Sequence, residues 1–227
     1  MINPVSYHDL LDAFSEPGCP VCRLALRSIE RFIASTNRDL VNTPDVWNEI
    51  MASQGFCNLH AQQWLSTAHP LGTAFIYEAL LERIGKEIER QKPGKGGGLR
   101  SRLGAGNPSA LMPEKRCLVC LHREEQEALL IATLLKGFGE TSFRTLYQRS
   151  PGLCVPHLRT ALGAANGEVF DLLRNHALNE QARLRDQLKE IIRKHDYRYR
   201  DEPIGEERDA TERAVNLIAG AKGIADR

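Results

Sequence analysis

Four short motifs decide the fold of this chain: GCPVC at residues 18–22, GFCNLH at 55–60, RCLVC at 116–120 and GLCVPH at 152–157. The second Cys-x-x-Cys motif follows the first by 98 residues, and the second Cys-x-x-His motif follows the first by 97. A fixed offset of this kind indicates an internal repeat, here with a single-residue deletion. All six cysteines of the chain fall inside the repeated motifs.

The motifs predict two four-ligand metal sites of Cys3His type, one in each half of the chain. Zinc prefers thiolate and imidazole ligands in a tetrahedral shell, and Cys-x-x-Cys lets two sulfur atoms from one turn reach the same ion. We assign the ligands by repeat, as Cys19, Cys22, Cys57 and His60 for the first site and Cys117, Cys120, Cys154 and His157 for the second. The sequence also allows the exchanged pairing, in which Cys19 and Cys22 join Cys154 and His157.

Zinc, at two ions per chain, is the cofactor that this ligand set favours. An iron–sulfur cluster ranks second, because its usual ligands are four cysteines, whereas each predicted site has three cysteines and a histidine. A catalytic zinc normally keeps one coordination position open, whereas four candidate ligands indicate a closed structural site. A thioredoxin-like redox pair is disfavoured, because it needs a strand–helix setting and the second motif has Leu118 where the first has Pro20.

The fold class is predicted to be all-α, with two duplicated helical units joined by a flexible linker. Apolar residues at helical spacing follow Cys22 and Cys120, and further helices are expected over 72–91 and 168–194. Thr43 with Pro44 predicts the start of a short helix ending near Gly55, and Thr141 predicts its counterpart. Trp47 and Trp64 are interpreted as core anchors and not as a platform for a ligand. The predicted domains are a first repeat at 1–91, a linker at 92–115, a second repeat at 116–195 and a C-terminal turn and helix at 196–227.

The C-terminal segment belongs to neither repeat. Residues 195–202 read HDYRYRDE, a dense mixture of charged and aromatic side chains. We interpret it as a salt-bridged turn that leads into a last helix at about 205–219. The inward face of that helix is expected to carry Ala210, Ala214, Val215 and Ile218.

The net charge and the distribution of apolar residues limit the classes of partner that the chain is expected to bind. The formal net charge is +1, so the chain as a whole has little attraction for nucleic acid, which is therefore a possible but not a favoured partner. No stretch approaches the ~20 apolar residues of a membrane span, and the N-terminus does not resemble a secretory signal. We therefore expect a cytoplasmic protein without a membrane partner.

The order CPVC, GFCNLH, CLVC and GLCVPHL, followed by KHDYRYRDEP and GEERDA, resembles a family of uncharacterised prokaryotic proteins of about this length. The resemblance implies a cytoplasmic protein with duplicated metal-binding motifs, and it supplies no activity and no catalytic residues. We expect a zinc-binding helical scaffold or regulatory protein that binds another protein and is not an enzyme. A thiol-based redox or metal-responsive sensor is the first alternative, and an iron–sulfur protein or a metal-dependent enzyme is the second.

Overall fold

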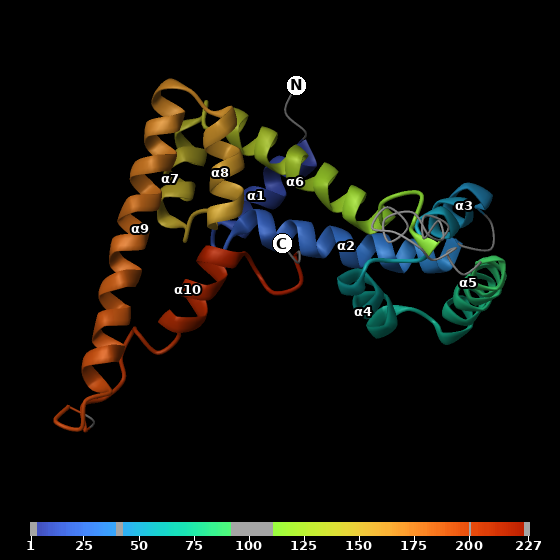
Figure 1. Ribbon diagram of the computed structural model, residues 1–227. Coiled ribbons are helices and arrows are strands. Elements are labelled where there is room, and N and C mark those ends of the chain that lie inside the picture. The colour runs from blue at the N-terminus through green and yellow to red at the C-terminus, as the bar shows by residue number, and fades with distance from the viewer. Residues whose placement is uncertain (1–3, 40–42, 92–110, 200, 225–227) are drawn as a thin grey trace, which may run out of the picture. The chain divides into compact units, whose positions relative to one another are not determined.

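The computed structural model describes residues 4–39, 43–91, 111–199 and 201–224 (Figure 1). Within these ranges the chain forms ten α-helices and no strand, which confirms the all-α prediction. The helices are α1 (Pro4–Ala13), α2 (Pro20–Asp39), α3 (Pro44–Ala52), α4 (Asn58–Thr67), α5 (Pro70–Arg90), α6 (Leu118–Gly137), α7 (Thr141–Arg149), α8 (Val155–Ala164), α9 (Gly167–Lys194) and α10 (Ala210–Ala219). Most of the expected linker, residues 92–110, lies outside the described residues.

The chain divides into two compact units that do not coincide with the two repeats. Unit 1 consists of residues 1–28 and 125–227, and unit 2 of residues 29–124. Both boundaries fall inside helices, within α2 and within α6. Each unit therefore combines segments from both repeats, and the expected ranges 1–91 and 116–195 describe the duplication in sequence but not the compact units.

An aromatic core holds unit 1 together. Phe14, Phe138, Phe143 and Tyr147 are all buried, and their rings meet edge to face at centroid distances of 5.0–5.7 Å. Such edge-to-face pairs place the positive rim of one ring on the negative face of the next. This packing fixes α7 against the loop after α1 and the end of α6, and so positions the segment that leads to Cys154.

Unit 2 is built around Trp64 of α4. Its side chain is fully buried, stacks on Phe56 at 4.7 Å between ring centroids, and donates a hydrogen bond from Nε1 to Thr73 Oγ1 at 3.0 Å. The prediction that Trp64 is a core anchor is thus confirmed. Trp47 is only half-buried.

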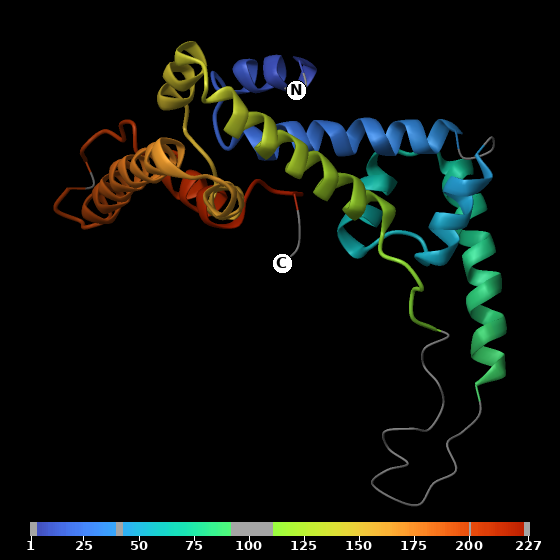
Figure 2. The ribbon, with the colours of Figure 1, turned by 90° about the horizontal axis from the view of Figure 1, so that it is seen from above.

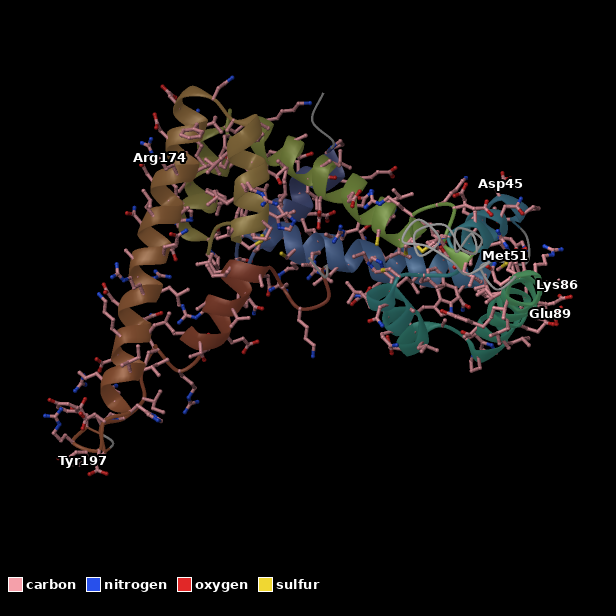
Figure 3. All side chains as sticks on the ribbon, viewed as in Figure 1. Asp45, Met51, Lys86, Glu89, Arg174 and Tyr197 are labelled. Carbon is pink, nitrogen blue, oxygen red and sulfur yellow. The ribbon has the colours of Figure 1, made fainter. Side chains whose placement is uncertain are left out.

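Helices α3 and α5 pack against each other within unit 2. Arg83 of α5 donates to the carbonyl oxygen of Met51 at 2.9 Å, at the end of α3. Figure 3 shows Asp45 and Met51 on α3, with Lys86 and Glu89 on the solvent side of α5. The polar outer face of α5 leaves its apolar face to cover α3.

The segment after α9 is a salt-bridged turn, as expected. Lys194 Nζ lies 2.7 Å from Glu207 Oε1, and this carboxylate also accepts a hydrogen bond from the Gly205 amide at 2.9 Å. The Lys194 hydrogen bond, followed by that from Gly205, lowers the pKa of Glu207 to about 2. Tyr197 lies at the far tip of this turn with its side chain exposed (Figure 3).

Two expectations for the last helix were wrong. The helix starts at Ala210 and not near residue 205, because Glu207 holds residues 205–207 in a turn. Val215 and Ile218 are 64% and 63% exposed instead of facing inward. Helical residues turn by about 100° each, so Val215 lies about 140° around the helix from the buried Ala210. Helix α10 packs on α8 and α9, and its Ala210 is buried.

A glycine in the left-handed region precedes the cysteine of each Cys-x-x-His motif. Gly55 has φ +87° and Gly152 has φ +77°. A Cβ atom added at Gly152 would lie 3.1 Å from the His176 ring, and one added at Gly55 would lie 3.2 Å from the Leu80 side chain. Both the backbone angle and the close neighbour therefore require glycine.

We expect Gly152→Ala to lower the free energy of unfolding by about 1–3 kcal/mol, because alanine is strained at this φ and its Cβ presses on His176. Gly163→Ala in α8 is the matched control, since its Cβ would meet no atom within 4 Å, and it should be neutral or stabilising by up to about 1 kcal/mol. Urea unfolding of the two variants measures both values. Equal changes in the free energy of unfolding for the two substitutions would contradict the requirement for glycine at residue 152.

Candidate metal centres

Each of the four motifs lies at the start of a helix. Cys57 is the N-cap residue of α4 and Cys154 that of α8, while Cys19 and Cys117 directly precede α2 and α6. The positive end of the helix dipole stabilises a thiolate there. Residues three apart on a helix share a face, so both ligands of each motif point to the same place.

Cluster 1 consists of Cys19, Cys22, Cys154 and His157, and all four belong to unit 1. The Cys22 and Cys154 sulfur atoms are 3.5 Å apart. His157 Nδ1 lies 3.5 Å from Cys19 Sγ, 3.4 Å from Cys22 Sγ and 3.2 Å from Cys154 Sγ. Three of the residues are buried, and Cys19 is half-buried.

Cluster 2 consists of Cys57, His60, Cys117 and Cys120, all in unit 2. His60 Nδ1 lies 3.2 Å from Cys57 Sγ, 3.6 Å from Cys117 Sγ and 3.3 Å from Cys120 Sγ. The Cys57 and Cys120 sulfur atoms are 3.6 Å apart. Cys57 and Cys120 are half-buried, so this cluster is the more accessible of the two.

The structure therefore groups the eight residues in the exchanged arrangement, and the assignment of one complete site to each repeat was wrong. Each cluster takes its Cys-x-x-Cys motif from one repeat and its Cys-x-x-His motif from the other. The physical reason is helix length. Helix α2 has 20 residues and spans about 30 Å, whereas α3 has 9 and spans only about 14 Å. The short helix cannot bring Cys57 back to Cys22, so the expected hairpin does not close.

The crowded sulfur atoms alter the protonation of both clusters. Burial alone lowers the pKa of His157, but hydrogen bonds with Cys154 and Cys19 outweigh it and raise this pKa to about 11. Burial raises the pKa of Cys120 to about 12, and the charge of Cys117 adds to the effect. A cation that binds among these sulfur atoms therefore displaces the protons that they and the imidazole hold.

Two further groups support cluster 1. Glu127 Oε1 of α6 lies 3.4 Å from His157 Nε2, on the side of the ring that faces away from the sulfur atoms. A carboxylate in this position fixes the ring so that Nδ1 faces the sulfur atoms, where a metal ion would be held. The Ala221 amide donates to Cys22 Sγ at 3.5 Å, and Ile224 packs over the same sulfur atoms. Sequence reasoning missed these residues, because Glu127 is one of several acids on α6 and residues 221–224 carry no motif.

The geometry matches that of a single ion held by four protein atoms. All four candidate donor atoms of each cluster lie within 4.8 Å of one another, and all six cysteines are free of disulfides. A tetrahedral ion with bonds of about 2.3 Å to sulfur and about 2.05 Å to nitrogen separates two sulfur ligands by about 3.8 Å and a sulfur and a nitrogen by about 3.6 Å. The distances in both clusters are close to these values, so either cluster could hold a metal ion.

Comparison with known proteins identifies a family but no activity. The model of a family described as "Family of unknown function (DUF6062)" matches residues 4–224. No curated protein and no solved structure matches the chain significantly. Among the described residues, none of the helices has the length and apolar character needed to cross a membrane.

The exchanged grouping predicts which pairs of substitutions remove one metal ion and which remove two. Cys22→Ser with Cys154→Ser damages cluster 1 only, so this variant should keep about one ion per chain. Cys22→Ser with Cys57→Ser damages both clusters and should keep none. Elemental analysis of the purified variants checks this. A grouping by repeat predicts the reverse outcome for the two variants, and each single substitution serves as a control.

Proposed function

The chain belongs to the family of unknown function whose model matches residues 4–224, and we propose that it is a zinc-stabilised helical scaffold that binds a protein partner. Both zinc ions are structural in this proposal. The observation that carries it is the convergence of three sulfur atoms and one imidazole nitrogen in each of two clusters. Zinc is the ion that most often takes this ligand set.

The short distances favour one ion per cluster over an iron–sulfur centre. The ligands of a four-iron cluster each bind a different iron atom, so their sulfur atoms stand well apart. In this protein Cys22 and Cys154 are only 3.5 Å apart, and Cys57 and Cys120 only 3.6 Å apart. The separation suits two ligands of the same ion.

A complete set of four protein ligands supports a structural role. A catalytic zinc needs a position for water or substrate, and the four ligands of either cluster would fill a tetrahedral shell. The bound ion would neutralise the thiolate charge and tie together segments far apart in sequence, such as the starts of α2 and α8 in cluster 1. The proposal also places the chain in a reducing compartment, because thiols must stay reduced to bind metal.

The exposed face of α10 supports the partner-binding part of the proposal. Val215 and Ile218 are one helical turn apart, and both are mostly exposed. Adjacent apolar side chains on a solvent-facing helix are suited to a hydrophobic groove or helix of another protein. Nucleic acid is the less favoured partner, given the net charge of +1.

The redox sensor is a second candidate, favoured by the exposure of cluster 2. Cys57 and Cys120 are half-buried and open to small oxidants, whereas Cys22 and Cys154 are buried. Oxidation of a thiolate ligand releases zinc, so cluster 2 would respond before cluster 1. The alternative of a metal-dependent enzyme has no comparable observation in its favour among the described residues, and it stays a prediction.

We expect the purified protein to be colourless and to contain two zinc ions per chain by elemental analysis. Removal of zinc by a strong chelator should lower helicity in circular dichroism, because the metal-binding free energy is also folding free energy. Readdition of zinc should restore it. Iron with a visible charge-transfer band, or full helicity without metal, would contradict the proposal.

For the partner, we expect Val215→Asp with Ile218→Asp to abolish recovery of a specific protein in affinity capture, because two charges cannot enter an apolar interface. Leu81→Asp on α5, where the side chain is 70% exposed, is the matched control and should retain the protein. Titration of the purified partner into the wild-type chain and into each variant then measures how much binding affinity is lost. Recovery that depends on nucleic acid, or that ignores the α10 substitutions, would refute the protein partner.

A further inference from the structure

A cavity of about 590 Å³ lies in unit 2, apart from the residues of cluster 2. It is formed by the last turn of α2, the first turns of α3 and the first turns of α5. Figure 2 shows the end of α2 beside the start of α5. Its volume lies in the range of small-molecule sites, roughly 300–1,000 Å³.

The walls of the cavity are mainly apolar and partly aromatic. Trp47 of α3 and Phe75 of α5 both line it, together with Leu71 and Pro44. Phe75 is 55% exposed and Leu71 58% exposed, although both lie on a helix that has an apolar face against α3. Large side chains held open to solvent around a cavity leave a surface that a flat apolar molecule could cover.

The polar groups of the cavity favour a negative charge. Arg38 lines it, and its guanidinium forms no ion pair or hydrogen bond with any of the residues that the structure describes. The described lining contains no carboxylate. The N-terminal turns of α3 and α5 also face it, and the N-cap residue Thr43 makes no side-chain hydrogen bond to the first amides of α3. The uncapped amides and the helix dipole at the start of α3 attract anions, whereas at the start of α5 the His69 side chain already accepts a hydrogen bond from the Leu71 amide.

Asn37 contributes a side-chain oxygen that lacks a hydrogen-bond donor among the described residues. Its Oδ1 atom is buried and has no hydrogen-bond partner among the described residues. Asn37 also lines the cavity, but this oxygen is itself shielded from solvent, so a ligand N–H or O–H reaches it only after the side chain turns. Apolar walls with a few converging polar groups are typical of ligand sites.

We propose that this cavity is a binding site for a small aromatic molecule that carries one anionic group, such as an aromatic carboxylate. Its rings lie between Trp47 and Phe75, and its anionic group pairs with Arg38. This site goes beyond the scaffold role, because it is separate from both clusters and needs no metal chemistry. It also revises the interpretation of Trp47 as a core anchor, since Trp47 forms part of the wall.

The test uses two fluorescent probes that differ in one group. 8-Anilinonaphthalene-1-sulfonate has an aromatic body with a sulfonate, and N-phenyl-1-naphthylamine has the same body without it. We expect the sulfonate to bind the full-length protein at one saturable site and more tightly than the neutral probe. An aromatic carboxylate such as 1-naphthoate should compete with it.

Three variants locate the site and its charge. Phe75→Ala should weaken both probes by about tenfold, and Trp47→Leu should do the same. Arg38→Gln should weaken the sulfonate by about threefold or more and leave the neutral probe unchanged. Arg31→Gln, at an exposed arginine of the same helix, is the matched control and should change neither.

The variants distinguish a lost binding site from a lost fold. Phe75 is half-exposed, so Phe75→Ala keeps the fold even if Trp47→Leu does not. Binding that does not saturate at one site, or that survives Phe75→Ala, would overturn the proposal. Equal affinities for the two probes, or an equal response of both to Arg38→Gln, would overturn the anionic part.

Discussion

The fold of this protein depends on two places where chain segments far apart in the sequence come together. In each, the start of a helix that carries Cys-x-x-Cys meets the start of a helix that carries Cys-x-x-His, and the four donor atoms come within 4.8 Å of one another. Thiolates at such short distances repel each other unless a cation lies between them. The left-handed glycines, the aromatic core of unit 1 and the packing of Trp64 in unit 2 all serve to hold these helix starts in place.

The exchange of ligands between the repeats explains why the compact units differ from the repeats. A site assembled inside one repeat would leave each half of the chain self-sufficient. Because cluster 1 joins residues 19–22 to residues 154–157, the N-terminal segment belongs with the second half of the chain. The segment from Ile29 to Glu124 then forms a unit of its own around cluster 2.

Much of this could be read from the sequence, for physical reasons. The eight Cys and His residues share one spacing, and prolines, threonines and glycines mark most helix starts and ends, so local rules place both. The grouping of the eight residues could not be read, because it depends on the unequal lengths of α2 and α3. The inward face of α10 does not follow from apolar residue type, because the small Ala210 is buried while the larger Val215 and Ile218 face solvent. Glu127 and the cavity beside Trp47 arise only from tertiary packing.

The discontinuity of unit 1 has a consequence for biosynthesis. Translation delivers Cys19 and Cys22 more than a hundred residues before their partners Cys154 and His157. Cluster 2, by contrast, gains its last member as soon as Cys120 emerges. The nascent chain can therefore complete cluster 2 first, while the thiols of Cys19 and Cys22 wait for Cys154 and His157 to be synthesised.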